Sequence, residues 1–111
     1  MRRTLLAAAL LAAAMALPDA GRAQEQSFSV SIKDHKFEPT ELEVPANQKF
    51  KLVVKNLDAT PEEFEMSNPL REKVVKGGQE GTIFLGPFAP GRYEFFGDFN
   101  PKTARGWIVA K

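Results

Sequence analysis

The residues best suited to binding a metal ion gather in one short segment, Glu62-Glu63-Phe64-Glu65-Met66. Three carboxylates within four residues repel one another, and such a run suits a β-strand poorly. One interpretation is a solvated edge strand whose charges oppose aggregation. The other is a preformed cation site, in which a bound metal offsets the repulsion. We favour the second and predict that at least one of these carboxylates binds metal.

Strand alternation divides this segment between two faces. Glu62, Phe64 and Met66 share one face, and Glu63 and Glu65 share the other. If Phe64 belongs to the core, Glu62 lies at one end of the barrel and Met66 points inward below it, either as core packing or as a thioether ligand. The sequence leaves open which face binds the metal. Two basic side chains could instead pair with outward-facing carboxylates: Arg71 and Lys73.

His35 and Asp98 are the remaining candidate ligands. His35 is the only histidine, and a lone histidine is more often solvated or part of a core than a ligand. The parity of the apolar residues changes between Ile32 and Phe37, so we expect a bulge that re-aims His35. Asp98 either stabilises a turn or binds metal. The candidate metal ligands are therefore His35, Glu62, Glu63, Met66 and Asp98. This mostly hard set suits iron, manganese, zinc or Cu(II) better than Cu(I).

Short strands separated by turns are expected to carry these side chains. The clearest is 50–55, with Phe50, Leu52 and Val54 on one face. Further strands are expected at 28–32, 42–44, 62–66, 81–85, 93–96 and 106–110. Pro39 excludes a central strand at its position, and 71–75 leads into the turn at Gly77-Gly78. No helical period persists for three turns after the leader, so the sequence predicts one all-β domain, a sandwich or barrel.

The first residues predict that the chain is exported. Arg2 and Arg3 precede an apolar run, Leu5 to Leu17, which is shorter than the roughly 20 residues that span a bilayer. We therefore expect a signal peptide at 1–23 and a folded domain at 24–111, not inserted in the membrane. Cleavage after Ala20 and retention of the leader as an anchor are the alternatives.

Charge and cysteine content exclude several functions. The leader contains three arginines and one aspartate, so its removal changes the net charge from +1 to −1. A nearly neutral domain with interspersed charges gives no reason to expect nucleic acid or an anionic membrane as partner. The chain has no cysteine, which excludes blue copper, iron–sulfur clusters and a cysteine nucleophile.

The order of strands and turns resembles the cupredoxin family, which implies a Greek-key β-sandwich. The resemblance is carried by Phe37-x-Pro39-x-x-Leu42-x-Val44-Pro45-Ala46, Phe50-x-Leu52-x-Val54-x-Asn56, Leu85-Gly86-Pro87 and Pro90-Gly91-x-Tyr93-x-Phe95-Phe96. The copper ligands of blue-copper members align with Glu62 for a His, Gly97 for the Cys, Asn100 for the second His, and Ala104 or Arg105 for the Met. None of these positions retains its ligand, so a type 1 copper centre is excluded.

Within the family, the chain looks most like domains of bacterial iron-uptake systems, the N-terminal domain of EfeO and the cupredoxin component of Ftr-type transporters. The segments that carry this likeness are 32–39, 56–65, 70–75 and 96–99. The chain lacks the cysteines that EfeO-type domains place near Phe37 and Phe96. The likeness implies a periplasmic copper- or iron-binding protein beside a membrane iron permease or a periplasmic iron-binding protein. It would relay metal or electrons, or act as a ferroxidase.

The alternative function is a metal-free exported sandwich that binds a partner protein. The aromatic residues expected to form its docking surface are Phe88, Phe96 and Phe99.

Overall fold

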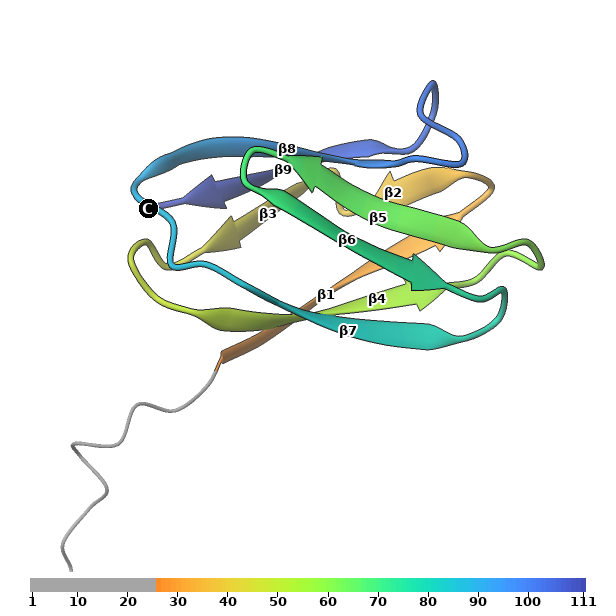
Figure 1. Cartoon of the computed structure of the whole chain (residues 1–111), viewed down its shortest axis with the longest axis horizontal. Coiled ribbons are helices and arrows are strands. Elements are labelled where there is room, and N and C mark those ends of the chain that lie inside the picture. The colour runs from red at the N-terminus through yellow and green to blue at the C-terminus, as the bar shows by residue number, and fades with distance from the viewer. Residues whose placement is uncertain (1–25) are drawn as a thin grey trace, which may run out of the picture.

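Nine β-strands form two facing sheets in the computed structural model, which describes residues 26–111 (Figure 1). The strands are β1 (Gln26–Lys33), β2 (Lys36–Glu38), β3 (Glu41–Val44), β4 (Phe50–Asn56), β5 (Glu62–Ser67), β6 (Leu70–Val75), β7 (Glu80–Leu85), β8 (Gly91–Gly97) and β9 (Arg105–Ala110). The predicted signal peptide lies outside the described residues. Within them, no helix is long and apolar enough to cross a membrane.

The strand order is that of a Greek-key sandwich, as predicted. One sheet has the order β2-β1-β4-β7 and the other has the order β3-β9-β8-β5-β6. β1 runs parallel to β4 and β3 runs parallel to β9, whereas the remaining neighbours are antiparallel. Because sequential strands are often placed in different sheets, loops from distant parts of the chain meet at the ends of the sandwich.

The predicted strands are present, and two details differ. Segment 70–75 is the full strand β6, which forms a hairpin with β5. The bulge expected near His35 is wrong: Asp34 and His35 form a two-residue turn with φ angles of 54° and 60°, the signs of a type I′ hairpin turn. This turn connects β1 to the short strand β2 and pairs Ile32 with Phe37. The reversal of the chain, not an inserted residue, therefore explains the change of parity.

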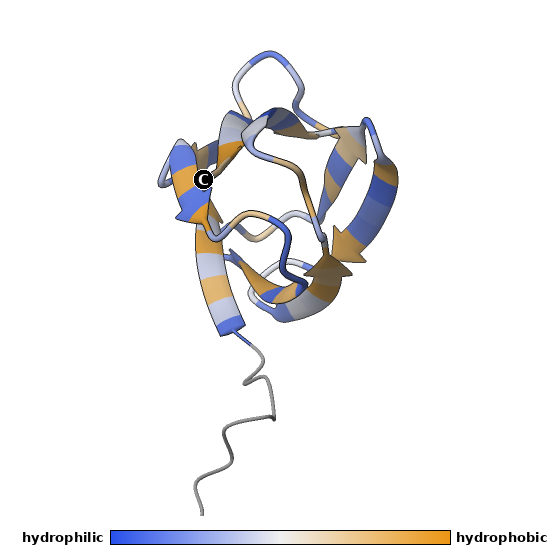
Figure 2. Cartoon of the chain, turned by 90° about the vertical axis from the view of Figure 1, so that its left-hand side faces the viewer, coloured by the Kyte–Doolittle hydropathy of each residue, from blue (hydrophilic) through white to orange (hydrophobic). Residues whose placement is uncertain are grey.

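The core is built from the inward-facing half of each strand, visible as alternating hydropathy along the ribbons in Figure 2. Its centre is a cluster of Phe37, Phe64 and Phe95, with ring centroids 5.0 to 6.2 Å apart. Gly106 of β9 lies directly against the ring of Phe95, where a Cβ atom would stand 2.4 Å from the ring edge. The ring thus occupies the space that a side chain at position 106 would need.

We predict that Gly106→Ala destabilises the fold by about 1–3 kcal/mol, because the added methyl overpacks the ring of Phe95. The measurement is urea unfolding at neutral pH. In a Phe95→Leu background, which lacks the clashing ring atoms, the same substitution should cost less. An equal cost in both backgrounds would contradict the proposed contact.

Candidate functional site

The parity of β5 decides which carboxylates face the core. Phe64 and Met66 are completely buried, so Glu62 points inward as well, and Glu63 and Glu65 lie on the outer face of the five-stranded sheet. This is the arrangement predicted for a core Phe64. Met66 packs within the core, which was the alternative to a role as thioether ligand.

Glu62 is only 4% exposed, and its carboxylate is held by three hydrogen-bond donors. Its Oε1 accepts the backbone N–H groups of Glu63, at 2.9 Å, and of Phe99, at 2.8 Å. Its Oε2 accepts the side-chain amide of Asn100 at 2.7 Å. We call Glu62, the Phe99 N–H and the Asn100 side chain the Glu62 latch. It fastens the loop after β8 to the start of β5.

The positions that align with blue-copper ligands meet at this latch. A Cβ atom at Gly97 would lie 2.6 Å from Cδ of Glu62 and 2.8 Å from Cβ of Ala104, and Asn100 bonds to Glu62. The alignment of these positions is thus geometrically consistent. The groups present are an engaged carboxylate, an amide, a methyl and a glycine, without thiolate or imidazole. This donor set does not fit a type 1 copper ion.

His35 lies at the same end of the sandwich but belongs to a different network. The Asp58 carboxylate accepts the backbone N–H groups of Asp34 at 2.7 Å and His35 at 3.0 Å, and His35 Nδ1 lies 3.7 Å from Asp58 Oδ2. The buried Asn56 side chain accepts the Asp58 N–H and donates to the carbonyl groups of Thr60 and Val75. The His35 side chain remains 46% exposed. It lines a cleft of about 410 Å³ against residues 99–103.

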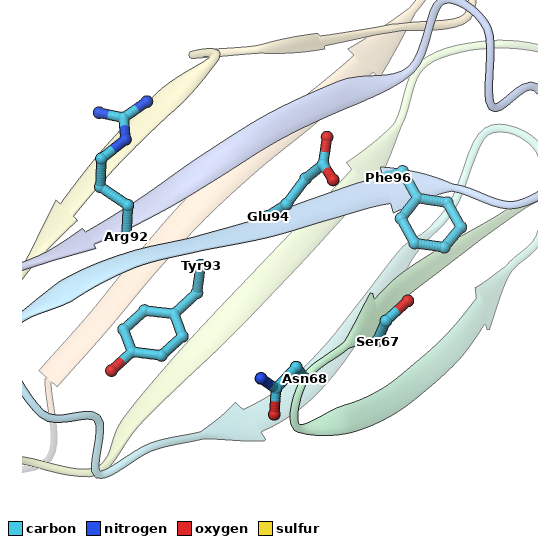
Figure 3. A pocket seen from close by; sticks show the side chains of 6 residues that line it. All are labelled: Ser67, Asn68, Arg92, Tyr93, Glu94 and Phe96. Carbon is cyan, nitrogen blue, oxygen red and sulfur yellow. The ribbon is translucent and has the colours of Figure 1, made fainter.

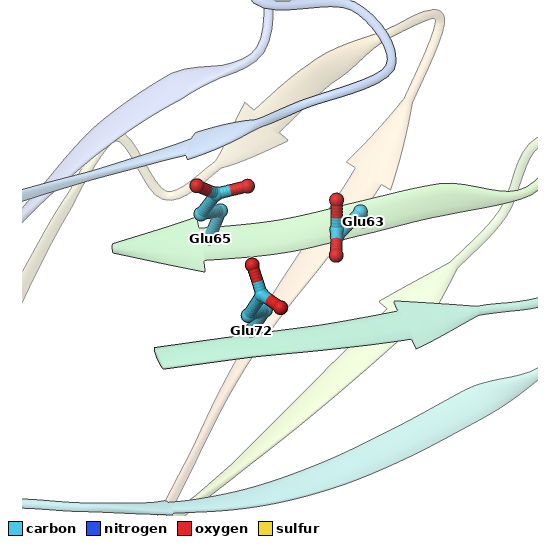
Figure 4. Close-up of side chains that lie close together, drawn as sticks. All are labelled: Glu63, Glu65 and Glu72. Carbon is cyan, nitrogen blue, oxygen red and sulfur yellow. The ribbon is translucent and has the colours of Figure 1, made fainter. Parts of the chain in front are cut away.

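The outer face of the β5–β6 hairpin carries a group of carboxylates: Glu63, Glu65 and Glu72 (Figure 4). One oxygen from each lies within 4.8 Å of the others, the only such His, Asp or Glu group among residues 26–111. Glu72 of β6 stands directly opposite Glu65. His35 is not part of this group. Sequence reasoning missed Glu72 because only the register of the hairpin shows that it faces Glu65.

The predicted alternative of ion pairs with Arg71 or Lys73 is not formed. In the hairpin register, Arg71 stands opposite the buried Met66 and Lys73 opposite the buried Phe64, so both belong to the inner side of β6. The ion pairs found within residues 26–111 do not include these lysine and arginine side chains.

The carboxylates of Glu63, Glu65 and Glu72 repel one another. Burial raises the pKa of Glu63, and the nearby carboxylates of Glu72, Glu65 and Asp98 raise it further, as does a side-chain hydrogen bond with Asp98. Burial also raises the pKa of Glu65, followed by the charges of Asp98 and Glu72. Asp98 is placed beside the group because its backbone N–H donates to the Glu63 carbonyl at 2.9 Å. We call Glu63, Glu65, Glu72 and Asp98 the acidic cluster.

A second cleft, of about 310 Å³, lies between the β5–β6 turn and β8 (Figure 3). It is lined by Ser67, Asn68, Arg92, Tyr93, Glu94 and Phe96. Its charged side chains have partners on the surrounding sheet, since Arg92 bonds to Glu41 and Glu94 to Arg105. Both charged side chains that line the cleft are therefore engaged in ion pairs.

The aromatic docking surface expected for a metal-free binding module is largely absent. Phe88 is buried at 5% exposure, and Phe96 is partly covered by the Arg105 guanidinium, 5.4 Å from its ring centroid. Of the three residues, Phe99 is the exposed one, at 48%.

Comparisons with known proteins give a family and a fold. A family model described as a cupredoxin-like domain matches residues 5–110. "Uncharacterized protein RP394" of Rickettsia prowazekii (strain Madrid E) is 44% identical over 92 residues, which cover 83% of this chain and 74% of that protein. Among solved structures, the blue copper protein auracyanin A of Chloroflexus aurantiacus has a TM-score of 0.68 at 15% identity, covering 79% of this chain and all of the other. Amicyanin of Paracoccus versutus has a TM-score of 0.63 at 16% identity, covering 83% and 88%.

We predict that Asp58 makes the fold sensitive to acid. Burial acts to raise its pKa, but the N–H groups of His35 and Asp34 and the charges of His35 and Lys33 outweigh burial, so the pKa of Asp58 is lowered in the folded state. Its stabilisation is therefore complete above the unfolded pKa, about 4, and is lost as the pH falls through the lower folded value. Urea unfolding should be measured at several pH values between 7 and 3. The free energy of unfolding should fall less between these values in Asp58→Asn than in wild type.

The control is Asp34→Asn, which removes a neighbouring exposed carboxylate and keeps the backbone N–H that Asp58 accepts. Parallel acid profiles for wild type and Asp58→Asn would show that the Asp58 bonds do not contribute this pH dependence.

Proposed function

Since the chain belongs to the family of cupredoxin-like domains and lacks the donors of a type 1 copper site, we propose that it binds a metal cation elsewhere, at the acidic cluster. The observation that carries the proposal is the direct opposition of Glu65 and Glu72 on neighbouring strands, beside Glu63 and Asp98. Like charges directly opposite each other in a sheet are destabilising. A bound cation would convert this repulsion into attraction.

The rest of the same sheet face supports the proposal by contrast. Arg92 bonds to Glu41 at 3.0 Å and stacks on the Trp107 ring, 4.8 Å from its centroid. Arg105 bonds to Glu94 at 3.0 Å. These glutamates on β3 and β8 are thus neutralised by arginines. The charges that shift the pKa values of Glu63 and Glu65 are all carboxylates.

The donor chemistry points to a hard cation. Carboxylate oxygens suit magnesium, calcium, manganese and iron, whereas thiolate and thioether ligands select Cu(I). Among these ions we propose iron, which agrees with the resemblance to iron-uptake domains. The cluster lies on an outer sheet face, where an ion can be exchanged with a partner. We further propose that the protein is periplasmic and passes its ion to a membrane permease or to another iron-binding protein.

This proposal uses two of the ligands predicted from sequence, Glu63 and Asp98, and adds Glu65 and Glu72. The predicted roles of His35, Glu62 and Met66 as ligands remain predictions that the proposal does not require.

We predict that the mature chain binds Fe(II) and Mn(II), one ion per chain, under anaerobic conditions. Glu65→Gln and Glu72→Gln should each weaken binding by about tenfold or more, because each removes one charged oxygen donor. Isothermal titration calorimetry measures both affinities. Glu43→Gln, an exposed glutamate on β3 of the same sheet, is the matched control and should bind like wild type. Absence of binding in wild type, or an equal loss in the control, would refute the site.

We also predict that Glu72→Lys stabilises the metal-free fold while it abolishes binding. The substitution replaces a repulsive pair across the hairpin with an attractive one. In the presence of EDTA, thermal unfolding should shift upward by a few degrees relative to wild type. A lower melting temperature would show that the opposed glutamates are not under repulsion.

A further inference from the structure

The end of the sandwich where the fold family implies copper is closed by the protein's own groups. We infer that the Glu62 latch is a metal-independent fastening of the loop after β8, and that the positions aligned with the copper ligands (Glu62, Gly97, Asn100 and Ala104) bind no metal ion. The inference does not rest on the acidic cluster. It rests on the bonds of Glu62, on the space around Gly97 and on the donor that Asn100 presents.

Both oxygens of the Glu62 carboxylate already accept hydrogen bonds. It is nine-tenths buried and accepts three hydrogen bonds, two on Oε1 and one on Oε2. Three of the roughly four lone-pair sites of the carboxylate are therefore taken, and an ion bound to Oε1 would have to displace the N–H of Phe99 or of Glu63. Those donors would then be left without their acceptor.

The loop after β8 holds Asn100 in place. The backbone N–H of Asn100 donates to the Gly97 carbonyl at 3.0 Å, and the carbonyl of Asn100 accepts the N–H of Ala104 at 2.9 Å. Gly97 in turn donates to the Ala104 carbonyl at 2.9 Å. Asn100 therefore enters the latch from a closed turn and not from a free loop.

Asn100 directs its amide N–H toward Glu62, and in this orientation it presents no lone pair to an ion held at Glu62. Gly97 has no side chain that could serve as a ligand, and a Cβ there would stand 2.6 Å from Cδ of Glu62. Each position that aligns with a copper ligand thus either takes part in the latch or has no side-chain atom that could coordinate a metal. The latch replaces a metal as the bridge between β5 and the loop.

The test exchanges the two partners of the latch in the mature chain. Asn100→Asp alone sets two carboxylates against each other and should release the loop. In the double variant Glu62→Gln/Asn100→Asp, the amide at position 62 can donate to the carboxylate at position 100, and its oxygen can still accept the N–H of Phe99. The readout is hydrogen exchange of the Phe99 amide, followed by NMR in the presence of EDTA.

We expect exchange of the Phe99 amide to accelerate by about tenfold or more in Asn100→Asp and to return to within a few-fold of wild type in the double variant. Wild-type protection should be the same with EDTA and with added Zn(II) or Cu(II). Failure of the double variant to recover, or protection that requires a metal ion, would overturn the latch.

A second arm separates the latch from the proposed function. Glu62→Gln keeps one acceptor oxygen, and the Asn100 amide can rotate to present its own oxygen, so the loop should stay protected. Its affinities for Fe(II), Mn(II) and Cu(II) should match those of wild type. If Glu62→Gln loses metal while Phe99 stays protected, the inference fails and Glu62 is a ligand. If wild type binds none of these ions but shows the recovery by exchange of partners, the proposed function fails and the latch stands.

Discussion

The two-residue period of β5 is fixed by Phe64 in the aromatic core. Both the Glu62 latch and the acidic cluster depend on this constraint. Phe64 packs against Phe37 and Phe95, so its strand cannot slip by one residue without exposing the ring and exchanging the two faces. With that parity set, Glu62 must be buried, and Glu63 and Glu65 must face outward. One run of carboxylates is thereby divided into a structural residue and a charged surface.

The inward and the outward carboxylates of β5 have opposite surroundings. A carboxylate can be buried only when hydrogen-bond donors of the protein replace the water that would otherwise solvate it. Glu62 obtains such donors from the loop after β8. The outward carboxylates meet more carboxylates across the hairpin and in that same loop, although arginines neutralise glutamates elsewhere on the same face. The loop therefore links the two: its Phe99 and Asn100 close the latch, and Asp98 adjoins the acidic cluster.

Local patterns in the sequence predicted much of this structure. Alternation in 50–55 and 62–66 located the strands and the division of β5 into two faces, because each strand has one apolar side. β2 was not expected, since three residues are too few to establish a period. Two of the three donors to Glu62 lie 37 and 38 residues away, and Glu72 joins the cluster through the register of a hairpin. Neither relation is visible in a single sequence without the pairing of strands.

The location of a bound ion tests the central claim most directly, because the latch and the acidic cluster lie on opposite sides of one strand. Crystals of the mature chain grown with Mn(II) would be measured at wavelengths on both sides of the manganese absorption edge. We expect an anomalous peak within coordination distance of oxygens of Glu63, Glu65 and Glu72, and an undisturbed hydrogen bond between Glu62 and Asn100. A peak at Glu62 and Asn100, or at His35, would contradict the central claim.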